Sequence, residues 1–216
     1  MISDFGMHEV LTILYGVWTT LALSAVAFLG GGLFGTLVAL ARTSAWNGLR
    51  MTAALYIDFF QGTPLLMQLF LVFYGLPVFG YHVSAWTAVS IGLTLNASAF
   101  LGEIWRGGIQ AVPKGQSEAA SALGLRYVSR MRDVVLPQAI KLSFAPTVGF
   151  LVQLIKGTSL AAIIGFVELS RSAQIVASTT YKPLIAYGLA GAFYFAICFP
   201  LSRFSAQLER RLTIKT

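Results

Sequence analysis

The sequence QSEAASALGLRYVSRMRDVVLPQA, which runs from Gln116 to Ala139, is a charged stretch in the middle of a largely apolar chain. Its charged residues fall within sixteen positions and are Glu118, Arg126, Arg130, Arg132 and Asp133. Long apolar runs lie on both sides of it. The stretch is therefore a polar connection between hydrophobic segments, and what it contacts bears on both fold and function.

The composition of the chain indicates the solvent in which it folds. Of the 216 residues, 56% are hydrophobic and only 11% are charged. A soluble domain usually carries about 25% charged residues, whereas a helix that crosses a bilayer needs roughly 20 mostly apolar residues. We therefore expect an all-α integral membrane protein. The formal net charge of +7 then reflects basic residues kept on the cytoplasmic side, and no nucleic acid partner is expected.

Five apolar segments are candidate membrane spans, and we expect them to form a single transmembrane domain over residues 1–216. They are Val10–Ala41, Met51–Leu76, Val83–Trp105, Ser143–Ile164 and Leu184–Leu201. In the first of them, Gly31 and Gly35 have the GxxxG spacing. That spacing indicates either a close contact between two helices or simply the abundance of glycine in membrane helices.

The distribution of lysine and arginine predicts the orientation. Residues 1–9 contain Asp4 and Glu9 but no basic residue, which argues against a cleavable signal peptide. If the N-terminus lies outside, twelve basic residues face the cytoplasm and only Arg171 and Lys182 lie outside. Because basic residues accumulate in cytoplasmic loops, we expect an N-out, C-in protein. The loop at about 106–142 is then cytoplasmic, and the segment at about 165–183 is external.

The charged loop shows the periodicity of an amphipathic helix. Its expected apolar stripe consists of Leu123, Tyr127, Met131 and Val134. We expect Glu118 near the start of this helix, where a carboxylate suits the helix dipole, a bend at Gly124, and the helix end at Pro137. The helix either lies on the lipid surface or inserts into a groove on a cytoplasmic partner. Its alanine-rich face favours docking.

The segment EAASALGLRYVSRMRDVVLP resembles the EAA motif of ABC importer permeases. The matching residues are Glu118, Ala119, Ala120, Gly124, Val134, Leu136 and Pro137. Other segments are similar to the polar amino acid permeases of the histidine and glutamine uptake class, namely GTPLLMQLF (Gly62–Phe70), EIWRGGIQAVPKGQSEAA (Glu103–Ala120) and KGTSLAAIIGFVEL (Lys156–Leu169). The resemblance covers most of the chain, from about Tyr56 to Leu212.

This resemblance implies a type I ABC importer transmembrane domain, multi-pass in the bacterial inner membrane, that translocates a polar amino acid. It implies three partners: a second permease chain, a dimer of ATP-binding subunits that use ATP and Mg²⁺, and an extracytoplasmic substrate-binding protein. It assigns ATPase coupling to Glu118, Ala119, Ala120, Gly124, Arg126, Leu136 and Pro137. The chain has no Gly-x4-Gly-Lys-[Ser/Thr] phosphate loop, so we expect it to hydrolyse no ATP and to hold no cofactor.

Polar residues at membrane depth are costly and therefore mark a candidate substrate path. They are Thr63, Gln68, Asn96, Glu103, Lys156, Thr158 and Ser159. The resemblance suggests that Glu103 meets the amino group of the substrate, and the alternative is a structural pair with Arg106. Lys156 meets either a substrate carboxylate or an acid on another helix. The hydroxyls contact either the substrate or backbone groups, and Pro64 either frees carbonyls that line a cavity or kinks its helix.

Two positions depart from the family pattern. Gly157 stands where the motif most often has Asp, and Gln61 stands where it usually has Arg. Loss of the acid weakens the case for a basic substrate. The chain therefore either handles an acidic or neutral amino acid, or is one half of a heterodimer whose partner holds the substrate.

The external segment Phe166–Thr179 is either an outer gate helix or an interfacial helix. One of its faces carries Leu169, Ala173 and Val176, and we expect Glu168 and Arg171 to be exposed. Three other classes of protein fit less well. A channel does not need a docking motif, a scaffold does not explain polar residues at depth, and an intramembrane enzyme needs a nucleophile with a base. We therefore expect no catalytic residue and no metal site.

Overall fold

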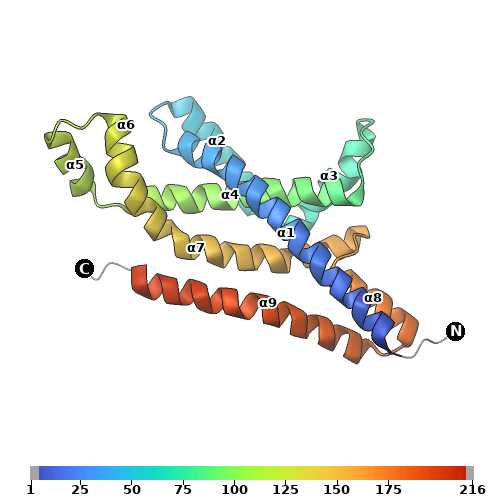
Figure 1. Cartoon of the computed structure of the whole chain (residues 1–216). Helices are drawn as coiled ribbons and strands as arrows, with labels where there is room; N and C mark the ends of the chain where they lie inside the picture. Colours follow the sequence, from blue (N-terminus) through green and yellow to red (C-terminus); the bar gives the residue numbers. More distant parts are fainter. Residues whose placement is uncertain (1–4, 213–216) are drawn as a thin grey trace.

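The computed structural model describes residues 5–212, and the regular elements in that range are all helical (Figure 1). They are α1 (Met7–Arg42), α2 (Asn47–Gly62), α3 (Leu65–Val78), α4 (Ala85–Ala111), α5 (Lys114–Ala122), α6 (Tyr127–Arg130), the π-helix Met131–Val135, α7 (Leu136–Gly157), the 3₁₀-helix Thr158–Ile164, α8 (Leu169–Thr180) and α9 (Pro183–Leu212). The predicted all-α class is confirmed.

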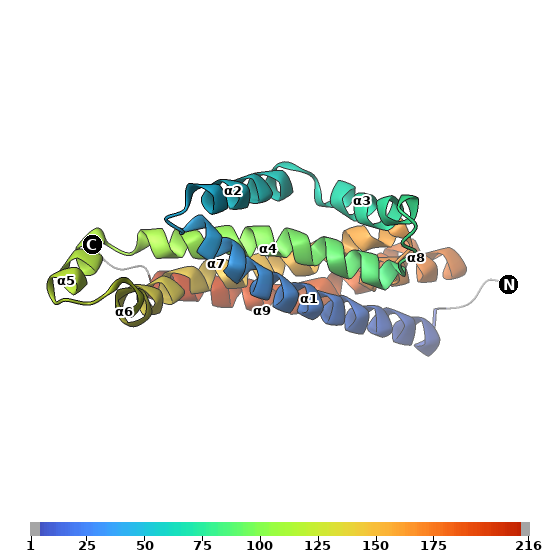
Figure 2. The same ribbon diagram turned by 90° about the horizontal axis from the view of Figure 1, so that it is seen from above.

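Five segments of the chain correspond to the predicted spans. Four segments are long and apolar enough to cross a membrane, namely α1, α4, the continuous run Tyr127–Ile164, and α9. The fifth is the pair α2 and α3, which is bent by 103° and lies along one side of α4 (Figure 2). The predicted span Met51–Leu76 is thus not one helix. Pro64 has no N–H to donate and disfavours helical geometry in the residue before it.

Helices α1 and α4 pack closely because small residues line their contact. A Cβ atom added at Gly31 would lie 2.5 Å from the Cβ of Ala97, and one at Gly35 would lie 3.1 Å from the Cβ of Leu101. Such close approach of two backbones is the use that membrane helices make of small residues. The GxxxG spacing therefore reflects a helix contact, and the alternative of incidental glycine is wrong for these two positions.

The basic residues gather at the end of the bundle that carries α5 and α6 (Figures 1 and 2). Helix α1 ends there with Arg42, and α9 ends there with Arg210 and Arg211. Lys182 lies at the opposite end, between α8 and α9. The predicted N-out, C-in orientation depends on this unequal distribution of basic residues between the two ends of the bundle. Asp4 and Lys215 lie outside the described residues.

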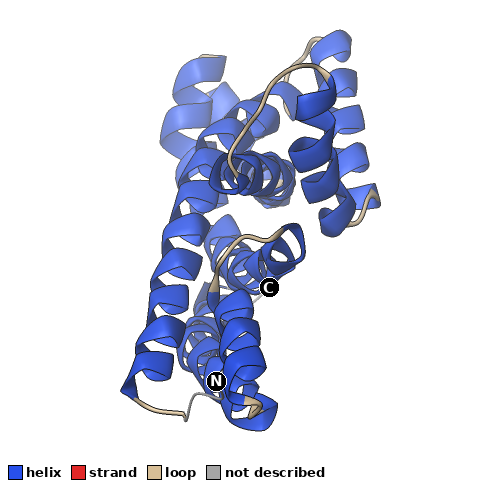
Figure 3. Cartoon of the chain, turned by 90° about the vertical axis from the view of Figure 1, so that its right-hand side faces the viewer, coloured by secondary structure: helices blue, strands red, loops and turns tan. Residues whose placement is uncertain are grey.

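The charged stretch is not the single helix that periodicity predicts. Loops and turns connect helices of the described range (Figure 3), and one of them divides this stretch. Helix α5 ends at Ala122, the chain turns at Gly124 with a φ of +79°, and α6 begins after it. Because this φ is left-handed and favours glycine, the bend predicted at Gly124 is confirmed. Leu123 and Tyr127 consequently lie on different elements and share no stripe.

Two further expectations for this stretch are wrong. Glu118 is the fifth residue of α5 and not at its start. Pro137 does not end a helix but occupies the first turn of α7, where a missing N–H is tolerated. The π-helical turn immediately before it carries the chain from α6 into α7 without a break.

Glu168 is fully buried, contrary to the expectation that it is exposed. Its carboxylate caps α8 by accepting hydrogen bonds from the backbone N–H groups of Ser170 and Arg171, at 2.9 and 2.8 Å. It also accepts one from the Tyr194 hydroxyl at 2.8 Å. A carboxylate is favoured at a helix N-terminus, and three donors make its burial tolerable. The predicted common face of α8 is confirmed, because Leu169, Ala173 and Val176 are all buried.

Substituting Gly31 by alanine should destabilise the protein, because the new methyl group would force α1 and α4 apart. Overpacking of this kind costs about 1–3 kcal/mol. Gly107→Ala is the matched control, since no atom lies within 4 Å of a Cβ placed there. Thermal unfolding in detergent should show a lower midpoint for Gly31→Ala only. Adding Ala97→Gly should restore it, and an unchanged midpoint in Gly31→Ala would contradict the contact.

Candidate functional site

The bend between α2 and α3 is held by one buried amide side chain. Gln68, in the first turns of α3, is 4% exposed. Its Nε2 donates to the backbone carbonyl oxygens of Phe60 and Thr63, at 2.9 and 3.0 Å, and to the Thr63 hydroxyl at 2.9 Å. Its Oε1 accepts a hydrogen bond from Asn96 Nδ2 on α4, at 2.9 Å. Thr63, Gln68 and Asn96, which the sequence analysis placed on a substrate path, thus form one network.

A cavity of about 370 Å³ lies beside this network. Its eleven lining residues come from α2, the bend, α3, α4, α7 and the following 3₁₀-helix, and none is ionisable. The polar ones are Gln61, Thr63, Asn96 and Gln153. Pockets that hold small ligands are usually of similar size, mostly apolar, and carry a few placed polar groups. The helix break at Pro64 adjoins this cavity, and the carbonyl oxygens of Phe60 and Thr63 at the break are paired with Gln68.

The two positions that depart from the family pattern both belong to the lining of this cavity. Gln61 and Gly157 line the cavity. A Cβ added at Gly157 would lie 3.2 Å from Leu65 Cδ2, which also belongs to the lining. A larger side chain at this position would change the shape of the cavity, and an acidic one would change its charge. Gln61 and Gly157, the two departures from the family pattern, thus line the same cavity.

The predicted hydroxyl groups mostly satisfy backbone carbonyls. Thr63 Oγ1 donates to the carbonyl of Phe59 at 2.7 Å. Thr158 is fully buried and donates to Ile155, and Ser159 donates to Lys156, both at 2.7 Å. Of these three residues only Thr63 lines the cavity.

Glu103 forms the structural pair that was one of its two alternatives. Its carboxylate accepts hydrogen bonds from the Arg106 guanidinium one turn along α4, the Nε contact being 2.8 Å long. Arg106 also donates to Gln110. Glu103 does not line the cavity beside Asn96. Its charge is thus compensated within α4.

Lys156 lies at the other side of α7, in a second and more polar cleft. This cleft of about 470 Å³ runs between α7 and α9 and is also lined by Gln153, Ser202, Ser205 and Glu209. Within residues 5–212, Lys156 forms no ion pair, so the pairing proposed for it is not made there. Gln153 belongs to both spaces. It was missed in the sequence because one uncharged polar residue in an apolar helix gives a weak signal.

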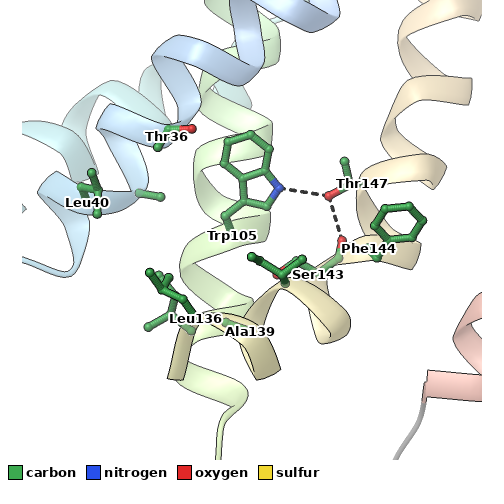
Figure 4. A pocket seen from close by; sticks show the side chains of 11 residues that line it. Thr36, Leu40, Trp105, Leu136, Ala139, Ser143, Phe144 and Thr147 are labelled. Carbon is green, nitrogen blue, oxygen red and sulfur yellow. Dashed lines mark hydrogen bonds between the residues drawn. The ribbon is translucent and has the colours of Figure 1, made fainter. Parts of the chain in front are cut away.

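A third space, between α1, α4 and α7, lacks groups that could recognise a polar ligand. It has a volume of about 430 Å³ and is lined mainly by apolar side chains, among them Leu40, Leu136 and Phe144 (Figure 4). Its Trp105 Nε1–H donates to Thr147 Oγ1 at 3.0 Å, and that hydroxyl donates to the Ser143 carbonyl at 2.7 Å. Its principal polar side chains are therefore already paired.

The residues assigned to coupling lie at the α5 and α6 end, but they are not equally accessible. Exposed are Glu118, Ala119, Gly124, Arg126 and Pro137. Ala120 is 4% exposed and packs inward, and Leu136 is half-buried. Arg130 donates to Ser121 and ties α6 to α5 across the turn. The segment thus presents an exposed charged surface held on a fixed turn.

Comparisons with known proteins agree with this architecture. A family model described as "Binding-protein-dependent transport system inner membrane component" matches residues 31–214. The chain is 40% identical over 199 residues to the probable amino-acid ABC transporter permease protein YckA of Bacillus subtilis (strain 168), covering 92% of this chain and 88% of the relative. It is 37% identical over 198 residues to the L-cystine transport system permease protein TcyB of the same bacterium, covering 91% and 85%.

A solved structure of an amino acid ABC transporter with histidines superposes with a TM-score of 0.90 at 37% identity, and the match covers 98% of this chain and 100% of that chain. The resemblance drawn from the EAA segment is therefore confirmed. The chain belongs to the family of binding-protein-dependent transport system inner membrane components, and it is a membrane-spanning permease subunit of an ABC importer.

Proposed function

We propose that this permease imports a polar amino acid with an uncharged side chain, and that the amino acid occupies the cavity beside Asn96. The observation that carries the proposal is the lining, which has four polar uncharged side chains and no ionisable one. An unpaired charge at membrane depth is costly, so a cavity without a counter-charge suits an uncharged side chain. The names of the relatives, an amino-acid permease and a cystine permease, support the substrate class.

In this proposal the chain lies N-out and C-in, with its basic end in the cytoplasm. There α5 and the turn at Gly124 contact an ATP-binding subunit, which uses ATP and Mg²⁺, while this chain holds no cofactor and hydrolyses no ATP. Exposed apolar side chains support a protein partner at this end, since Leu123 is 84% exposed and Tyr127 is 59% exposed. Aromatic residues of this kind are enriched where proteins meet.

Two further partners complete the proposed importer. A substrate-binding protein delivers the amino acid from outside, and a second permease chain, identical or different, lies alongside. The cleft that contains Lys156 supports the second chain, because a charged side chain at membrane depth needs a protein or aqueous neighbour. ATP and the binding protein drive transport only if they favour one state of the permease over the other.

Uptake into proteoliposomes tests the substrate. The permease, reconstituted with its own ATP-binding and substrate-binding partners, should show ATP-dependent uptake of glutamine or cystine. We expect this uptake to exceed that of glutamate, histidine and arginine by at least about tenfold, which corresponds to about 1.4 kcal/mol. Liposomes without ATP are the control. Uptake confined to arginine or histidine would mean that the uncharged lining does not select the substrate.

Glu118→Lys tests the docking surface. Glu118 is exposed and forms no hydrogen bond or ion pair with another residue in the range 5–212, so the substitution should leave the unfolding midpoint unchanged. Uptake should fall by about tenfold or more, as for a central interface residue. Gln116→Lys introduces the same lysine side chain roughly 200° around the helix and should retain uptake. Equal uptake in Glu118→Lys and the unsubstituted permease would exclude a docking role for this residue.

A further inference from the structure

We propose that Gln68 is a positioning residue that sets the hydrogen-bond polarity of the cavity, so that Asn96 presents its Oδ1 atom as an acceptor for the α-ammonium group of the amino acid. This inference rests on the proposed function, in which the cavity holds the transported amino acid. Gln68 itself is 4% exposed and does not line the cavity. Its effect on the substrate is therefore exerted through Asn96.

The orientation of the Gln68 amide follows from its neighbours. Two of them, the backbone oxygens of Phe60 and Thr63 at 2.9 and 3.0 Å, can only accept hydrogen bonds. The group that faces them must therefore be the donor, Nε2. If the amide were turned around, its oxygen would face two carbonyl oxygens, and the backbone at the bend would lose its donor. At membrane depth no bulk water is present to replace it.

The orientation of Asn96 follows in turn. Because Gln68 Oε1 points away from the bend, the atom of Asn96 that meets it at 2.9 Å must be a donor, which is Nδ2. The other atom of that amide, Oδ1, accepts no hydrogen bond from any residue within 5–212. Asn96 is 7% exposed and lines the cavity. The acceptor oxygen is thus the polar atom of this side chain that remains for a ligand.

The other polar groups of the lining are less suited to this role. The Thr63 hydroxyl already donates to Phe59 and accepts from Gln68. Gln61 and Gln153 are exposed and make no hydrogen bond with other residues of the range 5–212, so nothing fixes which of their two amide atoms faces the cavity. Among the three amide side chains of the lining, only that of Asn96 has its orientation fixed by a hydrogen bond within residues 5–212. A fixed acceptor avoids the ordering cost that a free amide incurs when it binds.

A fixed acceptor and an absence of charge match a particular ligand. Every amino acid carries an α-ammonium group, whose three N–H donors suit a carbonyl oxygen. A hydrogen bond in which the donor is ionised is about twice as strong as a neutral one. The acceptor therefore recognises the constant part of the substrate, and the uncharged remainder of the lining is left to discriminate between side chains.

Binding to the purified permease in complex with its ATP-binding partner tests this role. The probes are radiolabelled glutamine, with glutaramic acid (glutamine without its α-ammonium group) as competitor, and cystine with dithiodipropionic acid as the equivalent pair. The unsubstituted complex should prefer the amino acid over its deaminated analogue by about tenfold to a hundredfold, as expected for one charge-assisted hydrogen bond. Gln68→Met, which keeps the size but removes both polar atoms, should lose most of this preference.

Asn96→Asp supplies the discriminating variant. A carboxylate has an acceptor at both positions and needs no orientation, so Gln68→Met combined with Asn96→Asp should regain the preference for the ammonium-bearing ligand. The comparison is with Asn96→Asp alone: if Gln68 acts by orienting Asn96, Gln68→Met should lower the preference in the Asn96 protein but not in the Asn96→Asp protein. A purely structural role, in which the bend is distorted, predicts the same effect of Gln68→Met in both. The unfolding midpoint of each variant, measured in parallel, reports that distortion.

The outcomes separate the inference from the proposed function. A full ammonium preference in Gln68→Met, or no recovery in the double variant, would overturn the positioning role while leaving the cavity as the binding site. If neither glutamine nor cystine binds to the unsubstituted complex, the proposed function fails, and the inference fails with it. If Asn96→Leu keeps the preference, the acceptor lies elsewhere.

Discussion

The satisfaction of backbone carbonyls at the bend between α2 and α3 is the constraint on which the site depends. A bilayer offers no water to carbonyl groups that a broken helix leaves free, so they must be paired within the protein. Gln68 meets this need at Phe60 and Thr63. The same side chain then binds Asn96, which fixes α3 against α4. The bend, the cavity beside it and the direction of its polar groups thus have one origin.

The exposed end of the bundle is physically connected to this cavity. From Tyr127 to Ile164 the chain runs through α6, the π-turn, α7 and the 3₁₀-helix without leaving helical geometry. Arg130 joins α5 to this run at one end, and Gln153 and Gly157 line the cavity near the other. The exposed α5 end and the cavity are therefore connected by one continuous helical run. Contiguity of this kind permits coupling, and its strength is a matter for measurement.

Much of the architecture could be predicted because strong signals determine it. Apolar length predicts the spans, since hydropathy acts locally in sequence. The spacing of Gly31 and Gly35 allows a close helix contact, but that α4 is the partner is seen only in the structure. Other features depend on contacts that no local pattern contains. The left-handed turn at Gly124 separates Leu123 from Tyr127, which the helical periodicity places on one face. The burial of Glu168 depends on a hydrogen bond from Tyr194, a residue distant in the sequence. Of the polar residues predicted on a substrate path, Thr63 and Asn96 line the cavity and Glu103 and Lys156 do not, because which of them meet depends on the bend between α2 and α3.

Relatives named for different amino acids share the fold of this chain, so substrate specificity is expected to depend on local differences and not on the fold. A relative at 37% identity is named an L-cystine permease, and an amino acid ABC transporter solved with histidines superposes on the chain with a TM-score of 0.90, so proteins similar to this chain carry the names of different amino acids. The arrangement of helices is shared with the solved transporter, and in the proposed function the charge of the accepted side chain depends on a few positions that line the cavity. In this chain Gln61 and Gly157 occupy two of them, and both are uncharged. Because Glu103 is compensated by Arg106 within its own helix, it adds no net charge near the cavity, and in the proposed function discrimination between amino acids therefore rests on shape and neutral hydrogen bonds.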